Sequence, residues 1–135
     1  MVRRYVLDSS AVLIYLQDQP GADLVERLII EDDTELAISA INLAEVLYIV
    51  QRLGGELRAN EVERVLLDTV KIRVVDADWD RIRAAARIKA DGGLSFPDCF
   101  AVALAEELQA AVVTSDVEFR RAETARALSV VWLGQ

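Results

Sequence analysis

Short apolar segments alternate with longer helix-like segments along the whole chain, and this alternation restricts the fold more than any other feature. Strands are expected at residues 5–8, 35–39, 72–75, 111–114 and 130–133. Helices are expected at residues 9–16, then after Pro20-Gly21 through 30, and at 42–53, 59–69, 79–89 and 95–109, with a short one after 116. Buried strands separated by helices form parallel sheets covered on both faces. The pattern therefore predicts an α/β domain with a mainly parallel sheet.

The size of the chain predicts one domain spanning residues 1–135. About 53% of the residues are hydrophobic, which is enough for a substantial core. No apolar run approaches the roughly 20 residues of a membrane span. The lone Cys99 has no partner for an internal disulfide, which fits a reducing compartment. We expect a cytoplasmic protein without membrane association.

Four acidic residues stand where strands end or helices begin: Asp8, Glu45, Asp98 and Asp116. Sites in open α/β sheets form beyond the carboxyl ends of the strands. The helix that starts near Asp98 spans about 17 Å at 1.5 Å per residue. The strand that returns to Asp116 spans about the same length at 3.3 Å per residue. We therefore expect all four carboxylates to meet at one edge of the sheet.

A site built from carboxylates suggests metal binding, since the chain contains no histidine. Oxygen ligands hold hard divalent cations such as Mg²⁺ and Mn²⁺. Helix capping is the alternative for each acid, because Glu45 and Asp98 follow Asn42 and Ser95 at the spacing of a capping box. The two interpretations are compatible, since a helix N-terminus stabilises a nearby carboxylate.

The formal charge of −8 disfavours non-specific binding to nucleic acid, which depends on Lys and Arg. The basic residues are nevertheless clustered. Six of them fall in two groups: Arg81, Arg83, Arg87 and Lys89, and then Arg120 and Arg121. Each group is either a solvated helix face or a surface for RNA.

The chain resembles the PIN domains, and most closely the VapC-type toxin ribonucleases of toxin–antitoxin pairs. The resemblance is carried by four segments in order: Val6-Leu-Asp8-Ser-Ser-Ala, Asn42-Leu-Ala-Glu45-Val, Leu94-Ser-Phe-Pro-Asp98-Cys-Phe-Ala-Val-Ala-Leu-Ala and Val113-Thr-Ser-Asp116-x-x-Phe119. It implies a three-layer α/β/α fold around a parallel sheet of four to five strands. Pro97 departs from the pattern, which commonly has a small residue there.

The resemblance also implies function. It implies Mg²⁺- or Mn²⁺-dependent cleavage of RNA, a homodimer and inhibition by a small cognate antitoxin. By motif position, the catalytic and metal-binding residues are Asp8, Glu45, Asp98 and Asp116, and the supporting hydroxyls are Ser9, Ser10 and Thr114. A nuclease of the same fold that is not a toxin stays open as an alternative.

Two other functions are alternatives to the ribonuclease. A phosphotransfer domain with Asp8 as acceptor usually needs a lysine near the phosphate, and neither Lys71 nor Lys89 follows a strand end. A non-catalytic interaction module is disfavoured because all four acids are present. A binding role could coexist with catalysis, because an antitoxin would need an apolar groove. The apolar residues on the helices between Pro20 and Thr69 either line such a groove or belong to the ordinary core: Leu28, Ile29, Leu47, Ile49, Val62 and Leu66.

Overall fold

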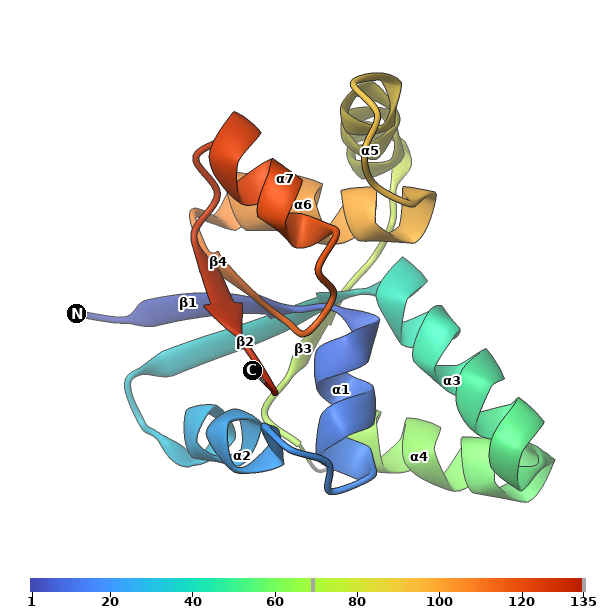
Figure 1. Ribbon diagram of the computed structural model, residues 1–135. Helices are drawn as coiled ribbons and strands as arrows, with labels where there is room; N and C mark the ends of the chain where they lie inside the picture. Colours follow the sequence, from blue (N-terminus) through green and yellow to red (C-terminus); the bar gives the residue numbers. More distant parts are fainter. Residues whose placement is uncertain (69, 135) are drawn as a thin grey trace.

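The computed structural model describes residues 1–68 and 70–134 and contains a five-stranded sheet with helices on both sides (Figure 1). The strands are Arg3–Leu7 (β1), Thr34–Ser39 (β2), Arg73–Val75 (β3), Ala111–Thr114 (β4) and Val130–Trp132 (β5). The helices are Ser9–Leu16 (α1), Ala22–Ile30 (α2), Ala40–Gly54 (α3), Glu56–Asp68 (α4), Trp79–Ala90 (α5), Phe96–Leu108 (α6) and Phe119–Ala125 (α7).

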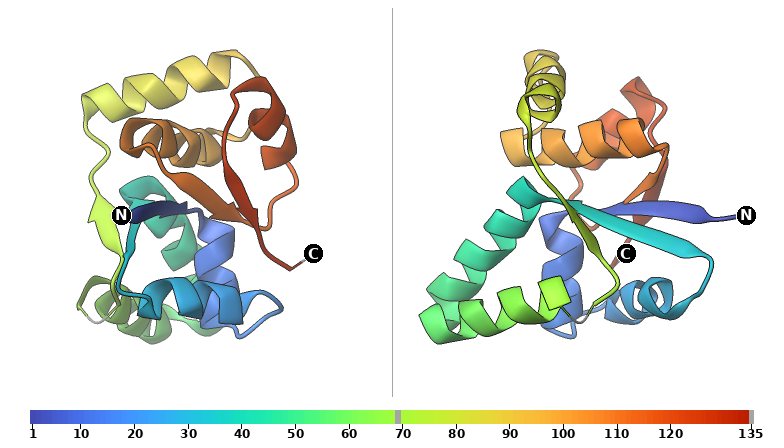
Figure 2. Two further views of the ribbon diagram at one scale, coloured as in Figure 1. Left: turned by 90° about the vertical axis from the view of Figure 1, so that its left-hand side faces the viewer. Right: turned by 180° about the vertical axis from the view of Figure 1, so that it is seen from behind.

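All strand pairs in the sheet are parallel, and the strand order is β3-β2-β1-β4-β5. Helices α1 to α4 lie against one face of the sheet and α5 to α7 against the other, as the two turned views also show (Figure 2). The predicted three-layer α/β/α fold is confirmed. Since every strand is parallel, the carboxyl ends of β1, β2 and β4 lie at one edge of the sheet.

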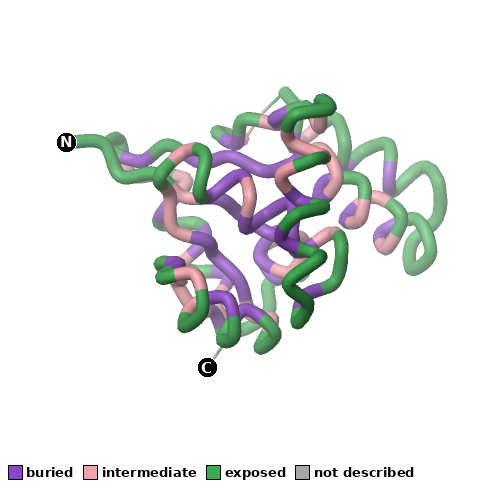
Figure 3. Tube along the Cα trace, turned by 90° about the horizontal axis from the view of Figure 1, so that it is seen from above, coloured by how far each residue is buried: buried purple, intermediate pink, exposed green. Residues whose placement is uncertain are grey.

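Two hydrophobic clusters hold the three layers together, one on each face of the sheet. Neighbouring residues of β1 serve opposite clusters, because side chains alternate along a strand. Leu7 packs with α1 to α4 and Val6 packs with α5 to α7, and both are fully buried. Figure 3 shows the buried residues concentrated in the central strands and on the inner sides of the helices. The sheet is thereby fixed from both sides, which also fixes the ends of its strands.

The first of these clusters decides the role of the apolar residues on α2 to α4. Leu28, Val62 and Leu66 are buried core residues. The core interpretation therefore holds for these three, and they do not line a surface groove. Different side chains are exposed on the outer surface of this region: Ile30, Tyr48, Leu53, Leu57 and Leu67. Among the described residues, no helix is long and apolar enough to cross a membrane.

Two helix starts differ from the sequence expectation. Helix α3 begins at Ala40 rather than at Asn42, because the Ser39 hydroxyl caps it by accepting from the Ile41 N–H at 3.2 Å. Helix α4 starts three residues earlier than expected and is followed at least to Asp68. The expected end of that helix, Thr69, lies outside the described residues.

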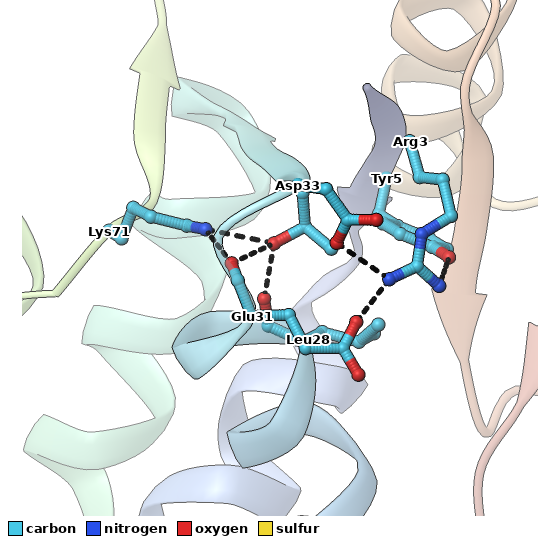
Figure 4. Close-up of polar contacts among 7 residues, drawn as sticks. Arg3, Tyr5, Leu28, Glu31, Asp33 and Lys71 are labelled. Atoms are coloured by element: carbon cyan, nitrogen blue, oxygen red, sulfur yellow. Dashed lines mark hydrogen bonds and ion pairs between the residues drawn. The ribbon is translucent and has the colours of Figure 1, made fainter. Parts of the chain in front are cut away.

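The amino ends of the strands are tied by a polar network of their own (Figure 4). Arg3 pairs with Glu31 and Asp33 before β2. The Lys71 ammonium donates to the Glu31 carbonyl at 2.6 Å and to the Thr34 hydroxyl at 2.8 Å. These contacts join β1, β2 and the segment before β3 at the edge opposite the expected site. These contacts stabilise the fold at the amino ends of the strands. The candidate site acids lie at the opposite edge, beyond the carboxyl ends of the strands.

Candidate active site

Asp8 follows β1 directly and its buried carboxylate is held by donors on both oxygens. Its Oδ1 accepts from the Ala11 N–H at 3.0 Å and from the Ser10 hydroxyl at 2.7 Å, so Asp8 is the N-cap of α1. Its Oδ2 accepts a short hydrogen bond from the Thr114 hydroxyl. A carboxylate has about four acceptor directions, and three of them are therefore occupied. Asp8 is a helix cap and still has capacity for one more partner.

Thr114, the last residue of β4, links Asp8 to the loop that carries Asp116. Its hydroxyl donates to Asp8 and accepts from the Asp116 N–H at 2.9 Å. The Ser10 hydroxyl accepts from the Ser115 N–H at 3.0 Å in the same way. The supporting roles expected for Ser10 and Thr114 have a physical basis in these bonds, which fix the loop relative to Asp8.

Three carboxylates gather beside this relay. Oxygen atoms of Asp98, Asp116 and Glu118 all lie within 4.8 Å of one another, a spacing that one cation could bridge. Asp98 is in the first turn of α6, and Ser95 caps that helix by accepting from the Asp98 N–H at 3.4 Å. Asp116 shapes its own loop by accepting from the Glu118 N–H at 2.9 Å. Side chains from α6 and from the loop after β4 thus meet as the chain geometry predicted.

Burial raises the pKa of two acids of the site, and for Asp98 the neighbouring Asp116 adds to the effect. The pKa of Asp98 is raised to about 8, first by burial and then by its hydrogen bond to Asp116 and the charge of that residue. The pKa of Asp8 is raised to about 6, mainly by burial, although the Thr114, Ala11 and Ser10 hydrogen bonds oppose this. Like charges close together resist simultaneous ionisation. In the metal-free site Asp98 therefore retains a proton near neutral pH, and Asp8 retains one in mildly acidic solution.

Glu45 lies on α3 and is not a member of the group of three. The Asn42 side-chain amide donates to the Pro97 carbonyl at 3.0 Å, which joins α3 to the start of α6. Glu45 is one helical turn after Asn42, on the same side of α3. Its Oε1 is a buried oxygen without a hydrogen-bond partner among the described residues. A buried acceptor of this kind is costly unless a donor or a cation satisfies it.

The capping alternatives have different outcomes. Asp8 is a cap, as above. The capping box expected for Glu45 is wrong because α3 is capped by Ser39, which makes Glu45 the sixth helical residue rather than the third. Asp116 does not stand at the N-cap of α7, a position that Glu118 occupies without a side-chain hydrogen bond. Glu45 and Asp116 are therefore not needed to begin their helices.

Sequence reasoning did not include Glu118. Glu118 could have been found from its position two residues after Asp116, because the loop between Asp116 and Phe119 was already expected to belong to the site. Ser9 was included, but no hydrogen bond of its hydroxyl is found within residues 1–68 and 70–134, so its role stays a prediction. Cys99 is completely buried, as expected of a core residue, and burial raises the pKa of its thiol.

The side chains present fit a divalent cation. All of them offer oxygen, which suits Mg²⁺ or Mn²⁺ and not softer metals. The unpartnered Glu45 oxygen and the crowded Asp98 and Asp116 carboxylates would both gain from a positive charge. The donor atoms of the site are therefore of the kind that a hard divalent cation prefers.

Comparison with known proteins gives consistent results. The family model for the PIN domain matches residues 5–125. The chain is 34% identical to Ribonuclease VapC of Mycolicibacterium smegmatis over 107 residues, which cover 75% of this chain and 82% of that protein.

Solved structures show the same fold at lower identity. VapC20 of Mycobacterium tuberculosis, described as a toxin that cleaves the sarcin–ricin loop, superimposes with a TM-score of 0.71 at 19% identity, covering 87% of this chain and 94% of that one. VapBC2 of Rickettsia felis, solved on a DNA fragment from its promoter, has a TM-score of 0.75 at 16% identity and covers 97% and 99% of the two chains.

Proposed function

Because the chain belongs to the PIN domain family, we propose that it is a divalent-metal-dependent endoribonuclease of the VapC type. The observation that carries the proposal is the convergence of Asp98, Asp116 and Glu118 beside the capped Asp8. A cytoplasmic location is part of the proposal.

Mg²⁺ or Mn²⁺ is the proposed cofactor, held by Asp98 and Asp116 with help from Glu118, Asp8 and Glu45. When bound, such a cation lowers the pKa of a ligated water and offsets charge on the scissile phosphate. The chain itself positions the ligands. Ser10 and Thr114 hold the Asp8 carboxylate in one orientation.

We also infer that carboxylates of the site orient the attacking water and accept its proton. The Glu45 oxygen is a buried acceptor without a partner among the described residues, whereas Asp98 holds a proton near neutral pH in the metal-free site. A water hydrogen-bonded to Glu45 would be oriented by that oxygen toward the phosphate, with its proton passing to a site carboxylate. No histidine is required, which agrees with a chain that has none.

The partners proposed are an RNA substrate, a small cognate antitoxin and a second copy of the chain. The VapBC toxin–antitoxin complexes with the same fold support the antitoxin. Exposed Leu53, Leu57 and Tyr48 on α3 and α4 provide apolar surface that such a protein partner could cover.

A cleavage assay tests this function. The purified protein should cut single-stranded RNA with Mn²⁺ or Mg²⁺ added and lose activity with a chelator. The Asp116→Asn variant should lose activity, whereas Asp32→Asn, an exposed acid before β2, should keep it. No cleavage of total cellular RNA under any of these metal conditions would contradict the proposal.

The toxin assignment has a separate test. Induced expression should arrest bacterial growth, and co-expression of the short neighbouring gene should restore it. Active cleavage in vitro without growth arrest would instead indicate a nuclease of this fold that is not a toxin.

A further inference from the structure

The negative charge of the protein raises the question of what holds RNA at the acidic edge. Of the basic side chains, several are neutralised by acids: Arg3, Arg4, Arg58, Arg81, Arg83 and Arg126 all form ion pairs. The helix-face interpretation therefore holds for Arg81 and Arg83 of the first basic group. Charge for binding phosphate must come from the remaining basic residues.

Arg121 is one of these residues, and its side chain packs against a specific position of the backbone. It lies over Gly93, in the loop between α5 and α6, so closely that a Cβ at Gly93 would be 2.5 Å from Arg121 Cδ and 2.8 Å from Nη1. No carboxylate within residues 1–68 and 70–134 forms an ion pair with Arg121. A guanidinium that is positioned but not neutralised is suited to binding an anion.

The loop under Arg121 is itself braced. The Lys89 ammonium donates to the Leu94 carbonyl at 2.8 Å, and Arg126 pairs with Asp91 at 3.2 Å. Gly93 has a φ of +90°, a conformation that side chains rarely adopt. Glycine at this position thus provides both the loop conformation and the space that Arg121 occupies.

Arg121 is also close in the chain to one member of the acidic group. It is three residues after Glu118, and residues at this spacing in a helix are roughly 5–6 Å apart between their Cβ atoms. The loop on which it rests leads directly into Ser95, the cap of the helix that carries Asp98. Arg121 is therefore flanked by both segments that deliver the carboxylates.

We propose that Arg121, held over Gly93, is a substrate-binding residue that contacts a backbone phosphate of the RNA beside the scissile one. This rests on the proposed ribonuclease function. Its neighbour Arg120 does not share the role, because its guanidinium stacks on the Trp132 ring at 4.7 Å from the ring centre. Arg120 is accordingly a matched control with the same charge.

Equilibrium binding tests the proposal independently of cleavage. All variants are made in the Asp98→Asn background, and the probe is a short fluorescein-labelled single-stranded RNA of mixed sequence, measured by anisotropy. A lost phosphate contact lowers the slope of log affinity against log salt by about 0.7 for single strands. Arg121→Gln should show that decrease and bind on the order of fivefold more weakly at low salt, whereas Arg120→Gln should match the background.

The glycines provide a second matched pair. Gly93→Ala displaces Arg121 and should reproduce the effect of Arg121→Gln. Gly92→Ala introduces a similar backbone strain, since φ is +80° there, but a Cβ at Gly92 meets nothing within 4 Å. It should bind RNA like the background protein, and melting temperatures check that each variant is folded.

Cleavage kinetics then separate this proposal from the function on which it rests. In the otherwise native chain, Arg121→Gln should raise KM with little change in kcat, and Arg121→Lys should restore part of the loss. An unchanged salt slope in Arg121→Gln, an equal loss in Arg120→Gln, or no binding by the background protein would overturn the role of Arg121. Absence of cleavage by the native chain would instead overturn the ribonuclease function, while the binding result would still stand.

Discussion

The hydroxyl of Thr114 donates to the carboxylate of Asp8, although 106 residues separate them in the chain. The same hydroxyl accepts from the Asp116 N–H. One side chain at the end of β4 therefore fixes the acid at the end of β1 and the loop of the next acid. The order of the site depends on this contact between neighbouring strands.

Thr114→Val should destabilise the protein, because it keeps the shape of the side chain but leaves the Asp8 oxygen and the Asp116 N–H without this partner. Loss of a buried hydrogen bond with unsatisfied partners costs about 1–3 kcal/mol in free energy of unfolding. Urea denaturation measures it. Thr124→Val is the control, since its exposed hydroxyl only bonds to the Arg120 carbonyl in its own helix. Equal losses in the two variants would mean that the Thr114 relay has no special role.

The metal-free protein should lose stability as the pH rises from about 4 to about 8. Asp8 and Asp98 have folded-state pKa values of about 6 and about 8, both raised from 3.8. Between the unfolded and folded pKa values the native state holds protons that the unfolded state has lost, so stability falls with rising pH. Melting temperatures in a chelating buffer at pH 5, 6, 7 and 8 test the slope. A flat or rising profile across this window would show that the pKa values of Asp8 and Asp98 are not raised in the folded protein.

Asp98→Asn should be neutral or stabilising without metal and should abolish cleavage. The amide keeps the shape of the carboxyl group and removes its repulsion with Asp116, so the metal-free pH profile should flatten above pH 6. Thermal unfolding and RNA cleavage are measured on the same preparation. A large loss of metal-free stability would instead indicate that the Asp98 carboxylate serves mainly to begin α6.

Mn²⁺ should raise the melting temperature of the native protein and not that of the Asp98→Asn/Asp116→Asn double variant. Ligand binding to the folded state alone stabilises it by mass action, about 2.7 kcal/mol at a hundredfold excess over Kd. Differential scanning calorimetry with and without Mn²⁺ provides the comparison. The same shift in both proteins would place the bound cation somewhere else on this acidic chain.

Glu118→Gln should weaken Mn²⁺ binding by roughly tenfold or more, the scale seen for loss of a supporting group at metal sites. The reason is that Glu118 contributes one of the three oxygens found within 4.8 Å of one another. Isothermal titration measures the affinity, with Glu63→Gln on the exposed side of α4 as a charge-matched control. If only Glu45→Gln weakened binding, the ligand set expected from the motifs would be correct and Glu118 would be a bystander.

Local pattern predicted most of the fold. The helix at 9–16 and the strand at 111–114 have the expected bounds, because apolar periodicity and the Asp8 cap are features of neighbouring residues. The start of α3 was wrong because Ser39 and Asn42 are both good caps and the local sequence does not choose between them. Because Ser39 caps the helix, Glu45 lies in its second turn and not in its first. One oxygen of Glu45 is buried there.

The sequence by itself determined that strands and helices alternate and that acids stand where they meet, since both follow from short-range spacing. It also determined that Asp98 and Asp116 reach the same edge, because the lengths of a helix and a returning strand match. Only the tertiary structure decided which oxygens touch: that Glu118 joins Asp98 and Asp116, that Thr114 bridges to Asp8, and that Arg121 rests on Gly93. Such contacts depend on strand register and on side-chain packing between segments that are distant in the chain, and neither is encoded in any local window.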